Sequence, residues 1–488
     1  MGRFWLSLII LAFFSLPVRI SFSQDLEKGE ALSISVKETR LIAMQNNLDV
    51  KLAQLDSRIK GTELSYKEAI FDTMLSGKID YTNNQLRPAS SIPGSKNITN
   101  NYNIGIDKKL RSGTDISLDF ANKREWSDST FVSTNPYHNS QIEIDITQPV
   151  AKNFFGLIDR GNIEIVKEEI KNVELDSYIK IEDAIISAEK AYWNLVLAIE
   201  EFKIKKEIFK KAVRLFNQYR HKLKIGLVET GDVLASEANM HVRESDLALA
   251  SNAVQSAQET LRLSLNLKNK ITLFPADKLS GQDFNTTFLE SLEAAFKNRR
   301  DYMSRKNEVE AKNIKLTMKA NSRFPEIDLR ATFATNGLSE KYYRAIEGIA
   351  EDSNPKYYVG LEFKFPLENN EANSEYEKAD LEKTRAIVSL QKTERQLISD
   401  VDEAFRKLVV SRADITKMVR VENLQKGKLS QEEKRFKYGR SSSDTLIRYQ
   451  GDLLNAQLSA LRSYFNYRVS MLGLMTAEDS YLKYVGIE

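Results

Sequence analysis

The first half of this chain recurs in its second half. Four segments return in the same order: Asp49 at Asp301, Gln148-Pro149 at Phe365-Pro366, Ala191-Tyr192 at Ala404-Phe405, and Ile225-Gly226-Leu227 at Tyr438-Gly439-Arg440. The offset is 252 residues for the first pair, 217 for the second and 213 for the last two. Such self-similarity indicates a tandem of one structural unit, so the order of elements within that unit decides the fold.

Each unit is predicted to run helix, strands, very long helix, sharp turn and long returning helix. None of the nine prolines lies between Val150 and Phe274 or after Pro366, and such stretches favour long helices. Repeat 1, at 24–286, is expected to hold a helix at 33–71, strands within 75–147, a helical hairpin at 157–267 and a connector at 268–286. Repeat 2, at 287–488, is expected to hold a helix at 287–322, strands within 327–365, a helical hairpin at 371–478 and a short tail.

The N-terminus has the pattern of a signal peptide. Arg3 precedes an apolar run from Phe4 to Leu16, and Ser21-Phe22-Ser23 supplies the small residues of a cleavage site. About a dozen apolar residues suit a signal-peptide core, whereas a spanning helix needs about 20. We predict a signal peptide at 1–23, with an uncleaved anchor as the alternative. Because no other segment is as apolar, an exported chain of this kind would have to enter a membrane with strands.

Composition narrows the function classes. The net charge is +3 with 28% charged residues, which gives no global field for nucleic acid. The chain has no cysteine, which excludes disulfides and a thiolate nucleophile. His138, His221 and His241 lack metal-ligand spacing, and the sequence has no nucleophile elbow or phosphate loop. We therefore expect no enzyme activity, no cofactor and no metal site.

Segments of alternating apolar and polar residues interrupt the helical sequence at matching places in the two repeats. In 141–147, three isoleucines alternate with Glu143, Asp145 and Thr147, and 358–365 alternates in the same way. Alternation over about nine residues is what a transmembrane barrel strand needs, although a half-buried strand of a soluble sandwich shows it too. The position of these segments inside a helical repeat favours the transmembrane interpretation.

Repeat 1 carries an extra pair of alternating segments, 102–110 and 114–122. They account for most of the 35 residues by which the offset falls between the first helix and the strand–helix junction. Their alternation favours a place in the barrel wall, whereas the lack of a counterpart in repeat 2 favours an appendage above the wall. Between these alternatives we favour the appendage.

The first long helix carries a seven-residue apolar repeat at Ile181, Ala188, Leu195, Phe202, Phe209, Phe216 and Leu223. A strict seven-residue repeat is typical of helices that supercoil around neighbours. Taken alone, it predicts a two-stranded coiled coil or a spectrin-like bundle. The strands between the helices argue against that alternative.

Several motifs together resemble the TolC-like outer-membrane efflux family. Segment 225–233, IGLVETGDV, looks like the first helix-hairpin tip of that family, and Tyr438-Gly439 with Asp444-Thr445-Leu446 is similar to the second. Segments 147–150 and 365–367 resemble its two strand-to-helix junctions. The resemblance covers nearly the whole chain after the predicted signal peptide.

The resemblance implies a mainly α fold with transmembrane β: a homotrimer whose strands close one shared outer-membrane β-barrel and whose helices form a periplasmic tube. It implies a passive channel, the exit duct of a tripartite efflux or type I secretion system. The implied partners are a periplasmic adaptor, an inner-membrane pump and outer-membrane lipid, with no nucleic acid. The alternative is a non-pore periplasmic coiled-coil scaffold or adaptor, which should carry one helical hairpin rather than two.

The resemblance also implies where the functional residues lie. It places adaptor docking at Gly226, Leu227, Gly439 and Arg440, and a periplasmic constriction at Asp232 and Asp444. Physical chemistry independently predicts glycines that end helices and aspartates that cap the returning helices. A purely capping role for the aspartates is as good an interpretation as a constriction.

Two positions depart from the family pattern. Asn369-Asn370 stands where a glycine is expected after the second junction, and Ile447 stands where some members carry an acidic residue. These departures leave the details of an acidic gate open.

Charge is also arranged around the first tip. Nine basic residues and one acid, Glu207, occupy 203–224, whereas 229–246 carries five acids and one arginine. We hypothesise that helices of opposite charge set the register near the tip and leave basic groups for an adaptor. A solvated helix face is the alternative.

Overall fold

The computed structural model describes residues 31–87, 92, 94–267, 271–281, 284–351 and 354–486. The predicted signal peptide at 1–23 lies outside these residues. The chain forms two compact units. Unit 1 comprises the chain up to Lys51 together with Ile181–Asn285 and Ala404–Leu474, and unit 2 comprises Leu52–Lys180, Thr286–Glu403 and the chain from Met475 onwards.

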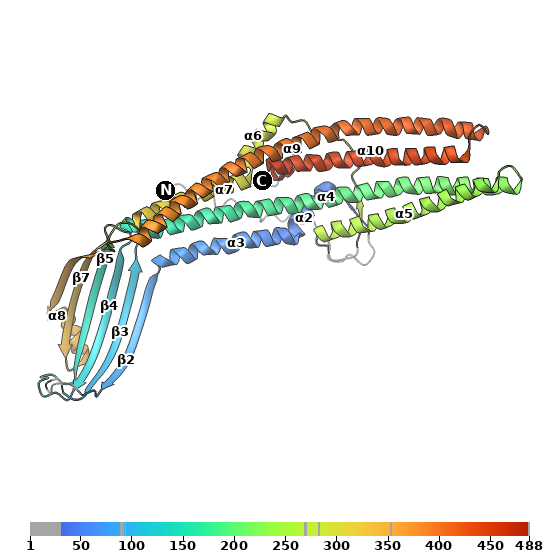
Figure 1. Ribbon diagram of the computed structural model, residues 1–488. Helices are drawn as coiled ribbons and strands as arrows, with labels where there is room; N and C mark the ends of the chain where they lie inside the picture. The colour runs from blue at the N-terminus through green and yellow to red at the C-terminus, as the bar shows by residue number, and fades with distance from the viewer. Residues whose placement is uncertain are drawn as a thin grey trace. The chain divides into compact units, whose positions relative to one another are not determined.

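The helices and strands are labelled in Figure 1. Their order along the chain is β1 (Ala31–Ile34), α2 (Val36–Asn46), α3 (Leu48–Glu68), η2 (Ala69–Phe71), β2 (Thr73–Asn84), β3 (Asn97–Lys109), β4 (Asp115–Ser127), β5 (Tyr137–Pro149), η3 (Phe154–Gly156), α4 (Leu157–Lys224), α5 (Thr230–Ser264), β6 (Thr272–Pro275), α6 (Phe288–Asn298), α7 (Arg300–Asn321), β7 (Glu326–Ser339), α8 (Tyr342–Glu351), β8 (Pro355–Lys364), α9 (Asn370–Lys437), α10 (Ser443–Glu478) and α11 (Tyr481–Val485).

The predicted unit of helix, strands and long helical hairpin occurs twice. The outgoing helices α4 and α9 each have 68 residues, and the returning helices α5 and α10 have 35 and 36. At 1.5 Å per residue, a 68-residue helix is about 100 Å long. The mostly helical fold with one large sheet is therefore confirmed.

The first helix of each repeat is broken, which corrects the single helices expected at 33–71 and 287–322. The break separates α2 from α3 at Asn47 (φ −58°, ψ 134°) and α6 from α7 at Arg299 (φ −58°, ψ 112°). These two positions are equivalent at the 252-residue offset. The Asn47 side chain accepts a hydrogen bond from the Asp49 backbone N–H at 2.7 Å, so a local asparagine cap competes with a continuous helix.

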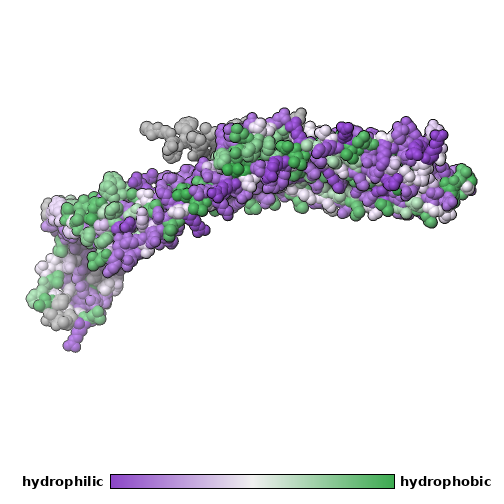
Figure 2. All heavy atoms as spheres, turned by 45° about the horizontal axis from the view of Figure 1, so that its top comes forward, coloured by the Kyte–Doolittle hydropathy of each residue, from purple (hydrophilic) through white to green (hydrophobic). Residues whose placement is uncertain are grey.

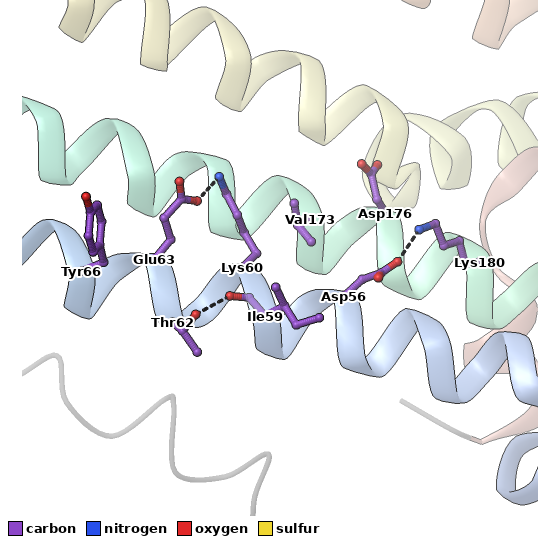
Figure 3. Close-up of a pocket in the computed structure, with 9 residues that line it drawn as sticks. All are labelled: Asp56, Ile59, Lys60, Thr62, Glu63, Tyr66, Val173, Asp176 and Lys180. Carbon is purple, nitrogen blue, oxygen red and sulfur yellow. Dashed lines mark hydrogen bonds and ion pairs between the residues drawn. The ribbon is translucent and has the colours of Figure 1, made fainter.

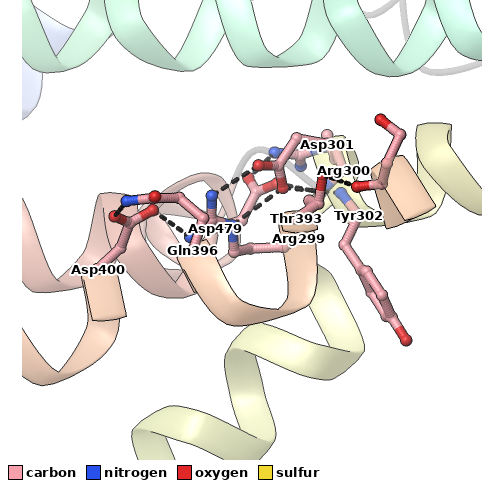
Figure 4. Close-up of polar contacts among 9 residues, drawn as sticks. Arg299, Arg300, Asp301, Tyr302, Thr393, Gln396, Asp400 and Asp479 are labelled. Carbon is pink, nitrogen blue, oxygen red and sulfur yellow. Dashed lines mark hydrogen bonds and ion pairs between the residues drawn. The ribbon is translucent and has the colours of Figure 1, made fainter. Parts of the chain in front are cut away.

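Each break is hydrogen-bonded to residues at or just after the end of the returning helix of the same repeat. In unit 1, the Asn47 side chain donates to the Ser264 carbonyl at 2.8 Å, and Asn266 donates to the Asn46 carbonyl at 3.2 Å. In unit 2, Asp479 accepts from the Arg300 backbone N–H at 2.7 Å and pairs with its guanidinium (Figure 4). The two repeats thus join the break to the end of the returning helix in different ways: by asparagine side-chain amides in repeat 1 and by an aspartate carboxylate in repeat 2.

Arg299 adds a second connection in unit 2. Its guanidinium bridges Asp301 at 2.6 Å and Asp400 of α9 at 2.9 Å, as Figure 4 shows. Burial alone would lower the pKa of Arg299, but its hydrogen bonds to the two carboxylates more than offset burial and raise it. The arginine is therefore held as a charged bridge between the start of α7 and α9.

Six antiparallel strands of unit 2 form one sheet in the order β2-β3-β4-β5-β7-β8. β3 pairs with β2 along residues 97–108 and with β4 along its other edge. The extra pair of segments at 102–122 therefore lies within the sheet, and the interpretation as an appendage is wrong. The absence of a counterpart in repeat 2 misled it, because a sheet can gain a hairpin on one side without a matching gain on the other.

The sheet has one apolar and one polar face. Residues directly opposite each other on antiparallel strands share a face, and one cross-strand row consists of Leu75, Ile106, Leu118, Ile144, Phe333 and Tyr357. All six of these side chains are exposed. The alternate positions carry polar residues such as Glu143 and Asp145. Hydrophobic side chains accordingly gather over part of the sheet in Figure 2.

The second strand-to-helix junction accommodates its missing glycine. Asn369 has a φ of +47°, and its side chain donates to the Arg323 carbonyl at 3.1 Å. Asparagine tolerates the left-handed region better than other residues with a side chain. The departure from the family pattern therefore keeps the backbone conformation that a glycine would provide.

Within the described residues, no helix is both long and apolar enough to cross a membrane.

Candidate functional site

The first hairpin tip joins α4 to α5. The Leu227 N–H donates to the Lys222 carbonyl at 2.9 Å, and the Gly226 N–H donates to the Leu223 carbonyl at 3.0 Å. This pair of bonds is a Schellman motif, which needs a residue in the left-handed conformation after the helix. Gly226 has a φ of +73°, and an added Cβ would meet nothing within 4 Å. The glycine is thus required by its backbone conformation and not by lack of space.

The second tip, between α9 and α10, repeats this geometry. The Arg440 N–H donates to the Arg435 carbonyl at 2.9 Å, and the Gly439 N–H donates to the Phe436 carbonyl at 3.1 Å. Gly439 has a φ of +70° and the same open surroundings. The recurrence in the sequence therefore corresponds to one helix-ending motif used twice.

Both tips expose apolar side chains. Ile225 and Leu227 at the first tip and Tyr438 at the second are between 57% and 76% exposed. Arg440, one of the residues expected to dock an adaptor, is also exposed. The four predicted docking residues are therefore accessible in this chain.

An apolar cluster joins the two hairpins just behind the tips. It packs buried side chains of the first hairpin against those of the second, namely Leu215, Tyr219 and Val233 against Leu429, Leu446 and Leu453. The rings of Tyr219 and Phe436 lie 6.1 Å apart, and the Lys222 ammonium lies 5.6 Å from the first ring centroid and 5.5 Å from the second. Cation–π contacts of this kind stabilise by about 0.5–1 kcal/mol at exposed sites.

The two predicted constriction residues differ in their surroundings. Asp232 is half-buried, and its carboxylate accepts a hydrogen bond from the Ser443 hydroxyl of the second hairpin at 2.9 Å. Asp444 is exposed. The chain therefore brings Asp232 to the other hairpin, whereas Asp444 faces solvent.

Neither aspartate is the capping residue of its helix, which corrects that part of the prediction. α5 begins after Glu229, and α10 begins after Ser442, whose hydroxyl accepts from the Thr445 N–H at 3.3 Å. Asp232 and Asp444 lie in the first turns instead, where a carboxylate still interacts favourably with the helix dipole.

Near the first tip, the ion pairs differ from the hypothesis that α4 and α5 attract each other through opposite charges. Lys210 pairs with Glu207 of its own helix at 2.7 Å, and Lys211 reaches Glu433 of α9 at 3.5 Å. In the described chain no ion pair joins 203–224 to the acidic stretch 229–246, whose acids Glu244 and Asp246 pair within α5. The predicted attraction between α4 and α5 therefore does not take the form of ion pairs.

A shallow groove in unit 2 lies between α3 and α4 (Figure 3). Ion pairs join the two helices here, from Lys60 to Glu169 at 2.8 Å and from Lys180 to Asp56 at 2.9 Å. Ile59 and Tyr66 of α3 line the groove. With Leu52 and Leu55 they form an exposed apolar row on α3 at spacings of three, four and seven residues. Such a row is typical of a helix that packs against another helix.

Sequence reasoning missed the residues that join the hairpins. The buried line of α4 near the tip runs through Ile208, Leu215 and Tyr219, whereas the seven-residue repeat points to Phe209 and Phe216, which are only half-buried. The partner residues lie more than 200 positions away in the second hairpin, so no local pattern could identify the face. Ser443 likewise gave no local signal. Among the described residues, no cluster of histidine and carboxylate side chains could hold a metal ion.

No protein-family model matches the chain, and no curated protein matches its sequence. Solved structures nevertheless share its fold. The Campylobacter jejuni CmeC outer membrane channel is 16% identical, with a TM-score of 0.65 over 93% of this chain and 90% of that one. CusC, whose structures concern folding and transmembrane channel formation, is 14% identical, with a TM-score of 0.67 over 94% and 95%. The open-state MtrE outer membrane channel of Neisseria gonorrhoeae is 15% identical, with a TM-score of 0.65 over 91% and 88%. The chain therefore has the fold of these outer-membrane channels.

Proposed function

We propose that this protein is a passive outer-membrane channel, the exit duct of a tripartite efflux or type I secretion system. The main support for this proposal is the exposed apolar face that continues across all six strands of the sheet. Exposed apolar area on this scale is unfavourable in water and favourable against lipid. The opposite face is polar, as the inside of a water-filled pore requires.

A homotrimer would complete the pore. The two edge strands, β2 and β8, are exposed along almost their whole lengths, so their unpaired backbone groups are free to bond to a neighbouring copy. Backbone groups in lipid must be satisfied within the protein, so edges of this length need such partners. The row of exposed apolar residues on α3 would then pack against a helix of the next copy.

The hairpin tips are the proposed docking site for a periplasmic adaptor, through Gly226, Leu227, Gly439 and Arg440. Exposed apolar side chains at each tip, beside basic residues of α4 and α9, suit an interface with an apolar centre and a polar rim. An inner-membrane pump would drive transport through such an adaptor. Reversing the charge of Lys210 and Lys211 to glutamate tests whether basic groups near the tip contribute to adaptor affinity, and an unchanged affinity would exclude that contribution.

Asp232 and Asp444 are the proposed constriction. Three copies of each aspartate would form rings of negative charge that favour cations. The hydrogen bond from Ser443 to Asp232 joins the two hairpins of one copy, so it would oppose their separation when the tube opens.

Conductance measurements test the proposal. Purified full-length protein in planar lipid bilayers should produce discrete current steps, and Asp444→Asn should reduce the preference for cations over anions without removing the steps. Ile447 stands one turn after Asp444, so no second acid at that position would mask the effect of the substitution. A protein that gives no steps would favour the non-pore periplasmic scaffold instead.

A further inference from the structure

The short helix α8 lies on the apolar face of the sheet. Figure 1 shows it beside β7, toward the ends of the strands that are remote from the helices of unit 2. A Cβ added to Gly337 of β7 would lie 2.3 Å from the Ala345 carbonyl oxygen and 2.7 Å from the carbonyl carbon of Gly348. Gly337 is directly opposite Ser140, which lies on the same face of β5 as the apolar isoleucines. The face of the sheet that α8 contacts is therefore the apolar face. The Thr335 hydroxyl also donates to the Ile349 carbonyl at 3.2 Å.

α8 packs on β5 and β7 near the cross-strand row at which this face changes from apolar to polar. One cross-strand row reads Ile79, Tyr102, Asn122, Ser140 and Gly337, whereas the neighbouring rows toward the helices are predominantly apolar. Asn122 and Ser140 are completely buried and hydrogen-bonded to each other at 2.5 Å. Polar groups exposed to hydrocarbon are costly, so this buried, hydrogen-bonded pair beside a helix that packs on β5 and β7 marks the border of the apolar band.

The outer surface of α8 is itself divided. Tyr342, Tyr343 and Ile346 are 49%, 52% and 37% exposed. Three charged residues, Arg344, Glu347 and Glu351, are exposed at spacings of three and four along another side of the helix. An apolar stripe beside a charged stripe is typical of a helix at a membrane interface.

We propose that α8 is an interfacial helix, with Tyr342, Tyr343 and Ile346 in the boundary between lipid headgroups and acyl chains. This inference rests on the proposed function, because it requires the apolar face to be in lipid. From the row of Lys108 to that of Tyr102, the face extends about 20 Å along the strands, close to the roughly 25 Å apolar band of outer-membrane strands. Tyrosines are enriched at the border of such a band.

The position of α8 favours lipid over a second copy of the chain as its partner. It packs on β5 and β7, which are internal strands of the sheet, whereas a neighbouring copy would pair with the edges β2 and β8. The ring of Tyr342 lies against His138 of β5, with ring centroids 5.7 Å apart, two residues beyond Ser140 on the side away from the apolar rows. The helix therefore begins just outside the apolar band.

The chain has no cysteine, so single cysteines can be spin-labelled without a background signal. The test uses the full chain in vesicles of phosphatidylethanolamine and phosphatidylglycerol, with three variants: Ile346→Cys, Glu347→Cys on the charged stripe, and Ile104→Cys on the apolar face of β3. The measurement is the accessibility of each label to oxygen, which partitions into lipid, and to a nickel complex, which stays in water. We expect the oxygen-to-nickel ratio at residue 346 to be several-fold higher than at 347 and lower than at 104.

Three other results overturn the inference in distinguishable ways. Equal nickel accessibility at 346 and 347 would place α8 in water. A label at 346 that is shielded from both reagents would place α8 against protein, such as a second copy. Nickel accessibility at 104 would take the sheet out of the lipid and would overturn the proposed function as well.

Discussion

At the residue scale, the tips depend on a few positions whose backbone conformation is more important than their side chains. Gly226 and Gly439 both adopt positive φ values in open space. The sequence alone predicted these two helix-ending glycines, because the same motif occurs twice at one offset. It could not predict the hydrogen bond between Ser443 and Asp232, because that contact depends on how two distant hairpins pack.

Replacing Gly226 or Gly439 with alanine should weaken the end of the preceding helix. A side chain in the left-handed region costs about 1 kcal/mol, which corresponds to roughly fivefold faster hydrogen exchange of the local amides. Exchange of the peptides that contain Leu227 or Arg440 measures this effect. Gly427→Ala is the control, since Gly427 lies inside α9 in open space without a positive φ and its replacement should stabilise the helix. Equal effects at 226 and 427 would contradict the argument.

Ser443→Ala should loosen the contact between the hairpins. Ser443 is buried, and its loss leaves the Asp232 carboxylate without this donor at a cost of about 1–3 kcal/mol. We expect faster exchange in the first turns of both α5 and α10. Ser441→Ala at the same tip is the control and should leave α5 unchanged. A change confined to α10 would show that the bond does not join the hairpins.

Glu382 should make stability depend on pH in the acid range. Hydrogen bonds from Lys315 and then Lys312 lower the pKa of Glu382 from 4.5 to about 2. Its contribution is therefore complete above about pH 4.5 and is lost as the pH falls toward 2. Glu382→Gln should lower the melting temperature at neutral pH and flatten its fall between these pH values. Glu377→Gln, on an exposed residue of the same helix, should behave like the unchanged protein, and a parallel response of both variants would contradict the assignment.

At the element scale, alternation predicted which side chains share each face of the sheet, because the two-residue period of a strand is a local property. It did not show whether the hairpin at 102–122 belongs to the sheet, because strand pairing is not local. α8 was missed for a related reason. Ten residues are few for a pattern, and its role is evident only from the strands β5 and β7 on which it packs, next to the buried pair Asn122 and Ser140.

An added charge should destabilise the folded protein much more on the apolar face of β3 than on its polar face. Ile104→Arg places a cation on the apolar face and should cost about 2–4 kcal/mol in a membrane, whereas Asn103→Arg places it on the polar face and should cost little. The measurement is the fraction of protein that folds into vesicles, followed across a urea series. Equal losses for the two variants would mean that the apolar face does not contact lipid.

At the scale of the whole molecule, surfaces that are unpaired or exposed in a single chain indicate an assembly of several copies. The edges β2 and β8 and the apolar row on α3 are exposed in the single chain, and each would be covered by a neighbour. The fold could be predicted from the tandem repeat, whereas the assembly followed from the resemblance of the tip and junction motifs. The physical basis for assembly is the unpaired backbone of the edge strands.

The most direct test of this account is electron microscopy of the detergent-extracted protein, with the particle mass determined on the same sample. We predict a particle with three times the mass of one chain, three-fold symmetry and a continuous hollow lumen. A single-chain particle, or a rod without a lumen, would contradict it and favour the scaffold alternative.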